Sequence, residues 1–342
     1  MNQPGPLNLL TDVAGLRVGN AGNDTLRSGV TVVLCEQPAV AAAAIHGGAP
    51  GSRETELLRP ECLVERIDAV VFSGGSSFGL DAAGAVAAEL AHEGRGFAVG
   101  TQRVPIVPAA ILFDLLNGGA KDWGAEPPYR ALGRQALAAA DYTFQLGNSG
   151  AGLGATAGPL KGGLGSASWV LSEGYTVGAL AAVNAFGSAL LPDSPLFWAW
   201  PFEQANELGD QRRLLASHPP GTVELDYTFQ SALAAANTTL CLVATDATLN
   251  KTQAARLALM AQTGLARALR PVYTPFDGDS VFALATGATA AEPLSAQTVA
   301  RLGSCAADCL SRAIARAVFE AASLPGWPSY RERYREHFPS PE

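Results

Sequence analysis

A dipeptide in the C-terminal third of the sequence would form a complete catalytic unit if the chain were cut inside it. Asn237 and Thr238 precede the apolar run Leu240–Thr245, which places Thr238 at the leading edge of an expected strand. A cut between them gives Thr238 a free α-amine, whose ordinary pKa of about 7.7–8.0 suits a general base at neutral pH. The same residue supplies a hydroxyl nucleophile, which its β-branched side chain holds in few orientations. A strand-leading threonine and an N-glycosylation sequon are the alternative interpretations.

A glycine-dense stretch upstream carries one lysine and is a second candidate part of a site. It includes Gly150 in G-N-S-G-A-G and Lys161 in K-G-G-L-G-S. Glycines let backbone N–H groups face an anion, and they leave Lys161 to be held by the backbone rather than by side-chain partners. A phosphate-binding loop or a plain cluster of turns is the alternative, although a glycine after Lys161 does not fit the pattern G-x-x-x-x-G-K-[ST].

Polar side chains beside two expected strands could complete the chemistry. Asn184 closes one strand within V-N-A-F-G, and its amide can donate to a carbonyl oxyanion, although a turn-forming asparagine explains it equally well. Asp277 and Asp279 flank Gly278 directly before another strand. Their carboxylates could orient the new α-ammonium and the hydroxyl, or recognise an amine on the substrate. An ordinary turn or part of a divalent-ion site would show the same residues.

The loop S-G-G-S-S-F-G-L-D, residues 73–81, precedes an expected helix. A helix N-terminus rich in glycine can line a pocket and offer N–H donors, so Ser76 and Phe78 are candidate substrate contacts together with Gly150. A tight strand-to-helix turn would have the same sequence.

The elements that must position these residues alternate irregularly between short β-rich runs and longer helical patterns, which favours a layered α/β or α+β fold over a parallel barrel. The patterns predict strands at Val30–Leu34, Ala39–Ile45, Ala69–Phe72, Tyr175–Asn184, Leu240–Thr245 and Val281–Thr286. They predict helices at Leu80–His92, Ala131–Ala139, Lys251–Leu269 and Ser295–Ala322. The proline-containing stretch Leu191–Asp226 is interpreted as an exposed connection that leads to the Asn237–Thr238 pair.

Composition narrows the class of protein. The chain has 342 residues, of which 48% are hydrophobic and 16% charged, and this balance predicts one large globular domain. A net charge of −8 without a cluster of Lys and Arg argues against a nucleic-acid partner. Five cysteines in no close framework and four histidines make a disulfide scaffold or a zinc site improbable. We see neither a signal peptide nor an apolar run of membrane-spanning length, so we expect a cytoplasmic protein with no membrane partner.

Taken together, the motifs resemble the L-aminopeptidase/D-esterase family, which includes β-peptidyl aminopeptidases and nylon-oligomer hydrolases. The series begins with L-T-D-V-A-G-L-R-V-G at residues 10–19 and passes through S-G-G-S-S-F-G-L-D, the G-A-G and K-G-G-L-G loops and V-N-A-F-G. It ends with N-T-T-L and F-D-G-D-S-V-F-A-L-A-T-G, so it covers nearly the whole chain. The resemblance implies a four-layer αββα sandwich, autocatalytic cleavage into chains 1–237 and 238–342, and homotetramers of cleaved protomers.

Carried over by position, Thr238 is similar to the nucleophile, Asn184 to the oxyanion-stabilising amide, Lys161 to the lysine of the glycine loop, and Asp277 with Asp279 to the acidic pair behind the nucleophile. The Asn-Thr cut is similar to that of the nylon-oligomer hydrolase branch. Two features depart from that branch. Lys161 comes two places later than expected, because Gly158 is followed by Pro159, and Phe78 stands where the branch has a tyrosine.

The expected reaction is hydrolysis of a linear amide through an acyl-Thr238 intermediate, with the α-amine moving protons and with no metal or cofactor. The expected substrates are small: short peptides with a small or β-amino N-terminal residue, D-amino-acid amides or esters, or ω-amino acid oligomers. An acyltransferase similar to the ornithine acetyltransferases and a non-catalytic protein that binds an acidic metabolite are the alternative hypotheses.

Overall fold

The computed structural model describes residues 2–219, 221, 237–289 and 294–338. The strands are β1 (Leu16–Asn23), β2 (Ser28–Ile45), β3 (Ser52–Arg53), β4 (Arg66–Ser73), β5 (Phe97–Val99), β6 (Gln102–Val104), β7 (Ala109–Ile111), β8 (Thr156–Ala157), β9 (Leu160–Lys161), β10 (Gly163–Val170), β11 (Thr176–Asn184), β12 (Thr238–Thr245) and β13 (Ser280–Ala285). The α-helices are α1 (Asp81–His92), α2 (Tyr129–Ala138), α3 (Gln211–Ser217), α4 (Lys251–Ala261), α5 (Thr263–Ala268), α6 (Ala296–Phe319) and α7 (Tyr330–Arg333).

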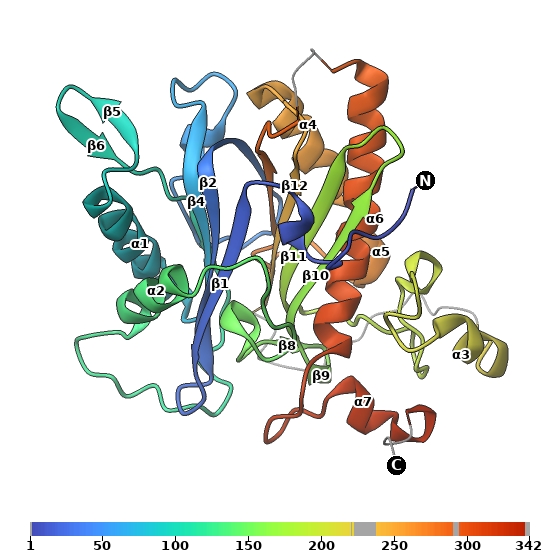
Figure 1. Cartoon of the computed structure of the whole chain (residues 1–342). Coiled ribbons are helices and arrows are strands. Elements are labelled where there is room, and N and C mark those ends of the chain that lie inside the picture. The colour runs from blue at the N-terminus through green and yellow to red at the C-terminus, as the bar shows by residue number, and fades with distance from the viewer. Residues whose placement is uncertain (1, 220, 222–236, 290–293, 339–342) are drawn as a thin grey trace.

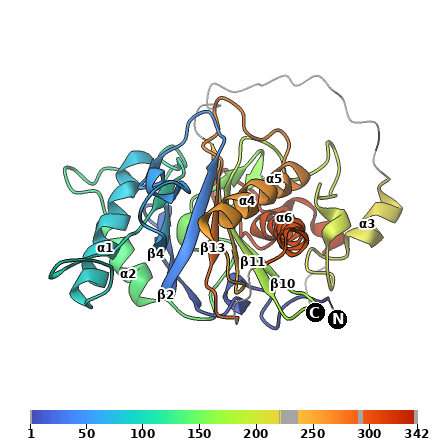
Figure 2. The ribbon, with the colours of Figure 1, turned by 90° about the horizontal axis from the view of Figure 1, so that it is seen from above.

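The long strand β2 connects the two halves of the main sheet. The strand order is β10-β11-β12-β13-β2-β4-β7-β3, with β1 also paired to β2. The first part of β2 pairs with β1 and β4, whereas Val40–Ile45 pairs with β13. A register shift between Leu34 and Ala39 separates these two parts. Because such an irregularity bends a strand, β2 can belong to two packed layers at once (Figures 1 and 2).

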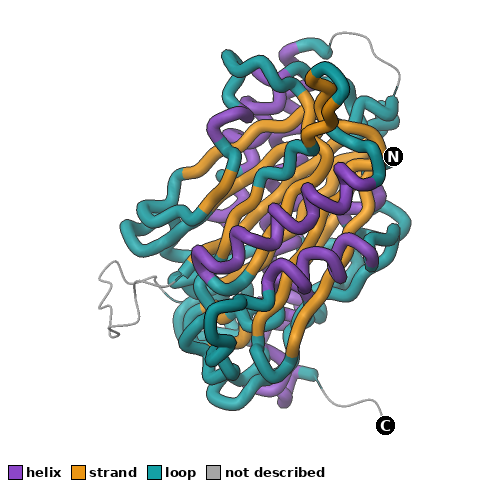
Figure 3. Tube along the Cα trace, turned by 90° about the vertical axis from the view of Figure 1, so that its left-hand side faces the viewer, coloured by secondary structure: helices purple, strands orange, loops and turns teal. Residues whose placement is uncertain are grey.

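Alternating strand side chains fill the three larger hydrophobic cores of the described residues and so define four layers. Between the two halves of the sheet, residues such as Leu180, Leu242 and Leu284 form one core, in which the Phe72 and Phe282 ring centroids lie 5.8 Å apart. Helices α1 and α2 pack on the outer face of β2 and β4, as Figure 3 shows from that side. Helices α4, α5 and α6 pack on the outer face of β10–β13. The predicted αββα sandwich is therefore confirmed.

The predicted elements are present with altered boundaries. The two runs Val30–Leu34 and Ala39–Ile45 form the single strand β2, because the residues between them stay extended through the bulge. The predicted helix Lys251–Leu269 is divided at Gln262 into α4 and α5. Strands β1 and β10 were not predicted from the sequence, although each is eight residues long.

The prediction that Leu191–Asp226 is an exposed connection is wrong for its first part. Leu196, Phe197, Leu208 and Leu214 are all buried, and α3 lies within this stretch. Phe197 packs against Phe319 of α6 and Tyr330 of α7, and Leu196 and Leu214 belong to a small cluster within the segment, so the prolines mark bends in a packed segment rather than a solvated loop. Residues 222–226, and the alanine-rich approach to the dipeptide, lie outside the described residues.

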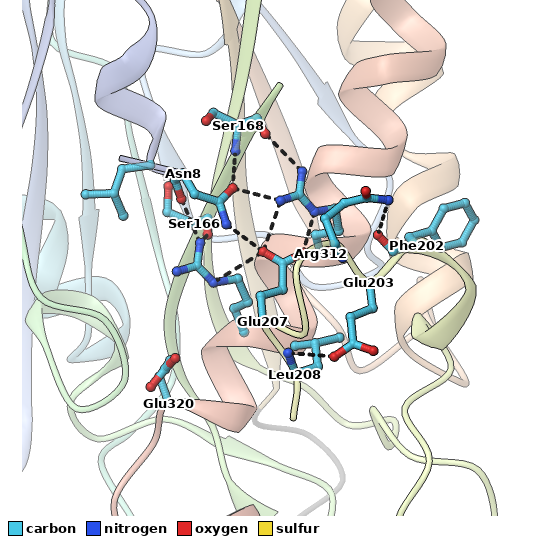
Figure 4. A network of polar contacts seen from close by, with 12 residues as sticks. Asn8, Ser166, Ser168, Phe202, Glu203, Glu207, Leu208, Arg312 and Glu320 are labelled. Atoms are coloured by element: carbon cyan, nitrogen blue, oxygen red, sulfur yellow. Dashed lines mark hydrogen bonds and ion pairs between the residues drawn. The ribbon is translucent and has the colours of Figure 1, made fainter. Parts of the chain in front are cut away.

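A buried ion pair holds this segment against α6. Glu207 accepts hydrogen bonds from Arg312 Nε at 2.5 Å and from Nη2 at 3.0 Å, and the two side chains are only 7% and 2% exposed. Asn8 completes the network, because its Nδ2 donates to Glu207 and its Oδ1 accepts from Arg312. Arg312 Nη1 donates to the carbonyl oxygen of Ser168 in β10 (Figure 4). Four segments that are distant in sequence therefore meet at one satisfied charge pair.

Helix α6 begins at a well-formed cap. The Ser295 side chain accepts a hydrogen bond from the Thr298 N–H at 3.1 Å, which satisfies a donor that the first helical turn leaves free. The helix continues for 24 residues and buries a long row of small residues against β10 and β11. Within the described residues, no helix is long and apolar enough to cross a membrane.

Candidate active site

Thr238 and Asn184 face each other across neighbouring strands. Thr238 is the first residue of β12, and its Cα partner in the antiparallel β11 is Asn184. Side chains paired in this way lie on the same face of a sheet. That face is the inner one, because Leu180 and Leu240, at even spacings from the two residues, belong to the core between the layers. Both polar side chains are buried, with exposed fractions of 4% for Thr238 and 2% for Asn184.

Two hydrogen-bond donors contact the carbonyl oxygen of the peptide bond between Asn237 and Thr238. The Thr238 hydroxyl donates to the Asn237 carbonyl oxygen at 2.6 Å, and the Gly278 N–H donates to the same oxygen at 3.0 Å. A Cβ at position 278 would lie 2.6 Å from Thr238 Oγ1, so glycine is required for this close approach. The sequence drew attention to the carboxylates on either side of Gly278 but not to its backbone N–H, which is the donor that contacts the carbonyl.

The acidic pair holds backbone groups around the dipeptide. Asp279 accepts from the Thr239 N–H at 2.7 Å and from the Tyr273 N–H at 3.0 Å. Asp277 accepts from both the N–H and the hydroxyl of Thr274, at 2.8 and 2.7 Å. The Asp279 bonds link the start of β12 to the loop before β13, and the Asp277 bonds hold that loop together. The two carboxylates therefore lie beside the Asn237–Thr238 dipeptide, and much of their accepting capacity is used by the backbone.

Burial raises the pKa values of both carboxyl groups. For Asp279 the pKa reaches about 7, mainly because of burial and further because of the negative charge of Asp277. For Asp277 burial also raises the pKa, and the hydrogen bonds from Thr274 oppose the shift. A carboxyl group that titrates near neutral pH can exchange a proton with a reacting group there.

The Asn184 amide has a fixed orientation. Its Oδ1 accepts from the Thr156 N–H at 2.9 Å, and its Nδ2 donates to the Phe113 carbonyl oxygen at 2.9 Å. Because the acceptor side is bound to a backbone donor, the NH₂ end of the amide is directed toward Phe113, in the segment that lines the cavity beside Asn237. This geometry is compatible with the predicted role as an oxyanion donor.

Lys161 is fully buried, and among the described residues no carboxylate forms an ion pair with its ammonium group. Its Nζ donates to the carbonyl oxygens of Gly152 and Gly162 at 3.0 and 2.8 Å, so the backbone holds it, as the glycine-dense sequence indicated. Burial lowers its pKa to about 7, and the charge of Asp114 opposes the shift. The lysine therefore also titrates in the neutral range.

A small cavity opens beside Asn237. Its volume is about 80 Å³, and the residues that line it are Phe113, Asp114, Leu116, Asn117, Gly154, Thr156, Asn184, Asn237 and Trp327. Sequence reasoning missed Asp114, which is 3% exposed, and burial raises its pKa. The run A-A-I-L-F-D gives no sign of a site by itself, since it also fits a buried strand that ends in a polar turn.

The three predicted substrate contacts lie outside the lining of this cavity. Ser76 has a φ of 53°, and its N–H donates to the Leu112 carbonyl, directly before the cavity segment. Phe78 is 45% exposed and packs edge-on against Trp123. Gly150 is buried beside Thr31. Their roles in substrate binding stay predictions.

The arrangement can support acyl transfer. A hydroxyl and a carbonyl group are in contact, the Gly278 N–H donates to the same carbonyl oxygen, and the buried carboxyl groups of Asp277 and Asp279 lie on the adjoining loop. Within the described residues, no group of three or more His, Cys, Asp or Glu side chains is placed to hold a metal ion.

Comparison with known protein families gives a match over most of the chain. The sequence profile of peptidase family S58 matches residues 8–330. An uncharacterized aminopeptidase of Mycobacterium tuberculosis is 42% identical, over 98% of this chain and 100% of the relative. A 6-aminohexanoate-oligomer endohydrolase of Kocuria sp. is 27% identical, over 80% of this chain and 74% of the relative.

Two solved structures have the same fold. A β-aminopeptidase of Burkholderia sp. has a TM-score of 0.70 and 23% identity, with 100% of this chain and 97% of that chain covered. An L-aminopeptidase D-Ala-esterase/amidase of Ochrobactrum anthropi, described as a variant of the Ntn hydrolase fold, has a TM-score of 0.71 and 22% identity, with coverages of 98% and 95%.

Proposed function

Because this chain belongs to peptidase family S58, whose members hydrolyse peptide or amide bonds, we propose that it cuts itself between Asn237 and Thr238 and then uses Thr238 as its nucleophile. The comparisons place the chain among hydrolases rather than acyltransferases or non-catalytic binding proteins.

Self-cleavage begins with attack of Thr238 Oγ1 on the Asn237 carbonyl carbon. A C–O bond forms, the hydroxyl proton moves to a buried base, and the negative charge on the carbonyl oxygen is stabilised by donors. The C–N bond then breaks, the Thr238 nitrogen takes up a proton, and an ester remains. Water hydrolyses this ester and releases the carboxylate of Asn237.

The cleaved protein repeats the same chemistry on a substrate. The new α-amine of Thr238 takes the proton from Oγ1 as it attacks the substrate carbonyl, and it returns a proton to the leaving amine. Water then attacks the acyl-Thr238 ester, and the hydroxyl is regenerated. Asn184 and the Gly278 N–H are the proposed oxyanion donors, and Asp277, Asp279 and Lys161 are the groups that set the charge of the site.

One observation carries this proposal. The Asn237 carbonyl oxygen accepts both from the Thr238 hydroxyl, at 2.6 Å, and from the Gly278 N–H, at 3.0 Å. The nucleophile and an oxyanion donor are thus already arranged around the bond that would be cut, within a buried part of the fold.

The experiment is intact mass spectrometry of the purified chain over time. We expect the mass of residues 1–342 to be replaced by the masses of 1–237 and 238–342, with a new N-terminus that reads T-T-L-C. A Thr238→Ala variant should stay intact, whereas Thr238→Ser, which keeps a hydroxyl, should be cut. Cleavage of the alanine variant at the same bond would refute the role of Thr238.

The named relatives are aminopeptidases and hydrolases of 6-aminohexanoate oligomers, so we propose short peptides or linear oligoamides for this chain. A panel of aminoacyl p-nitroanilides, D-amino-acid amides and esters, and aminohexanoate oligomers would rank them by kcat/KM.

We also propose a homotetramer of cleaved protomers in the cytoplasm. The family resemblance supports the tetramer, and five free cysteines, three of them buried, support a reducing compartment. Light scattering of the purified protein measures the number of protomers in the assembly. Fractionation of the producing cells shows the compartment in which the protein lies.

A further inference from the structure

We propose that Asn117 is a positioning residue for Asn184, the proposed oxyanion donor. Asn117 lies in one of the two segments that hold the Asn184 amide, and its side chain is bonded to the other segment. It thereby fixes the direction in which the Asn184 amide points. The inference rests on the proposed function, because it gives Asn117 a part in the reaction that Thr238 is proposed to carry out.

The Asn184 amide is held between two backbone segments. Its Oδ1 accepts from the Thr156 N–H at 2.9 Å, and its Nδ2 donates to the Phe113 carbonyl oxygen at 2.9 Å. Strand pairing fixes the backbone of Asn184, but the rotation of its amide depends on where the segments 113–117 and 154–156 lie. An amide turned by half a rotation would offer an oxygen in place of an N–H to the developing oxyanion.

The side chain of Asn117 ties these two segments together. Its Nδ2 donates to the Gly154 carbonyl oxygen at 3.1 Å, two residues before Thr156. The same Nδ2 donates at 2.6 Å to the carbonyl oxygen of Arg27, in the turn between β1 and β2. Arg27 Nη1 donates back to the Asn117 carbonyl oxygen at 3.0 Å. Oδ1 of Asn117 accepts from the Gly119 N–H at 3.2 Å, so both ends of this amide are bound.

The contact between Asn117 and Gly154 depends on a close approach. A Cβ at position 154 would lie 2.4 Å from Asn117 Nδ2 and 2.0 Å from the Arg27 carbonyl oxygen, so glycine is required for the three groups to meet. Asn117 is only 8% exposed. Removing its amide leaves nearby backbone groups without their partner, and the two segments are then no longer held at a fixed separation.

The location of Asn117 raises one alternative role, which is direct contact with the substrate. Asn117, Thr156 and Asn184 all line the cavity beside Asn237. The two roles have different consequences. A residue that touches the substrate keeps its effect on the rate when Asn184 is removed, whereas a residue that acts through Asn184 loses its effect.

The test is a double-mutant cycle between positions 117 and 184, with kcat measured per cut chain as counted by intact mass. We expect Asn117→Ala to lower kcat by about tenfold or more and to leave KM within about twofold, because the oxyanion donor is displaced and the substrate-binding surface is kept. Self-cleavage, which needs no substrate, should slow by a similar factor. In the Asn184→Ala background, Asn117→Ala should change either rate by less than about twofold. Equal effects of Asn117→Ala in the two backgrounds would overturn the inference.

A second variant reaches the same contact from the other side. Gly154→Ala places a Cβ against Asn117 Nδ2 and should show the same coupling to Asn184→Ala, so the inference stays testable if Asn117→Ala does not fold. Asn250→Ala, which removes a side chain that accepts from a backbone N–H at the cap of α4, is the matched control. It should lower the free energy of unfolding by urea without changing kcat or self-cleavage. A loss of rate in Asn250→Ala as large as that in Asn117→Ala would assign the effect to general destabilisation and overturn the inference.

Hydrogen exchange separates this inference from the proposed function. In the uncut Thr238→Ala protein, adding Asn117→Ala should speed exchange of the Thr156 N–H, measured by NMR, by about tenfold or more, because its bond to the amide oxygen opens more often. The Thr239 N–H in β12 is the internal control and should exchange at an unchanged rate. Faster exchange at Thr156 in a protein that hydrolyses no member of the substrate panel would refute the proposed function alone. Hydrolysis by the wild-type protein with unchanged exchange at Thr156 would refute the positioning role alone.

Discussion

Asn184 and Thr238 occupy directly paired positions in two neighbouring antiparallel strands, β11 and β12. They are 54 residues apart in the sequence, yet the register of the sheet points both side chains into the same buried space. The position of the proposed nucleophile relative to the proposed oxyanion donor is thus set by strand pairing, which is among the most rigid relationships a fold provides.

Replacing Asn184 by Asp should slow both self-cleavage and hydrolysis. The variant keeps the oxygen that accepts from the Thr156 N–H but loses the Nδ2 donor. Loss of one oxyanion donor costs about 10²–10³ in rate, so we expect a reduction of this order. The measurements are the rate of fragment formation by mass spectrometry and kcat on the best substrate. Asn250→Asp, a change at the cap of α4, is the matched control and should cleave normally.

A single methyl group at position 278 should block self-cleavage. In Gly278→Ala the new Cβ would lie 2.6 Å from Thr238 Oγ1, so the hydroxyl or the loop must shift. We expect an intact chain with a circular dichroism spectrum like that of the wild type, and at least a tenfold slower cut, since small misplacements have large effects on acyl transfer. Gly221→Ala, where a Cβ meets no atom within 4 Å, should be cut at the normal rate. Normal cleavage of Gly278→Ala would contradict the geometry described above.

Stability should depend on pH in two opposite ways because of two site residues. Asp279 has a folded pKa of about 7, above its unfolded value near 3.9, so the folded state holds an extra proton between these values. Its contribution to the free energy of unfolding therefore falls as pH rises toward 7. Lys161 has a folded pKa of about 7, below its unfolded value near 10.4, so its contribution rises from about pH 7 to pH 10.

The combined effect of these groups is a stability minimum near pH 7. Urea unfolding of the uncut Thr238→Ala protein from pH 5 to pH 10 measures it without interference from cleavage. Adding Asp279→Asn should remove the fall on the acid side, and adding Lys161→Met should remove the rise on the alkaline side. If each added change left its side of the profile as it was, the assigned pKa shifts would be incorrect.

Removing the buried charge of Glu207 should destabilise the fold strongly. Glu207→Gln leaves the Arg312 guanidinium in a buried site without its counter-charge, and breaking such a pair costs about 3–5 kcal/mol. The free energy of unfolding by urea gives the value. Glu89→Gln, which breaks an exposed pair with Arg134, should cost about 0.2–1 kcal/mol. Equal effects of the two changes would show that burial does not strengthen the Glu207 pair.

Much of the fold was predictable because the core strands have strong patterns. β-Branched runs located β4, β12 and β13, and the long α6 followed from its apolar spacing. Strands β1 and β10 were missed because glycine, serine and asparagine interrupt their apolar pattern. The packing of the segment 191–218 could not be predicted, since the burial of its apolar residues depends on contacts with α6 and α7 that no local pattern reports.

The site could be predicted only in part. Motif order pointed to Thr238, Asn184, Lys161, Asp277 and Asp279 as candidates. The fold pairs Asn184 with Thr238 and places the two aspartates on the adjoining loop, whereas Lys161 lies in β9 and donates to the carbonyl oxygens of Gly152 and Gly162. Asp114 and the Gly278 N–H could not be found in this way. A backbone donor has no sequence signature, and an aspartate at a strand end becomes informative only when the opposite wall of its cavity is known.

The position of β12 and β13 has a consequence for a chain that is cut after Asn237. Both strands lie after residue 237, and they are inserted between β11 and β2, which come before it. Two polypeptides produced by a break at that point would share one sheet, in which two strands of the second polypeptide lie between strands of the first. Dilution alone should not separate them, and neither piece made separately would have a finished sheet to which the other could simply dock.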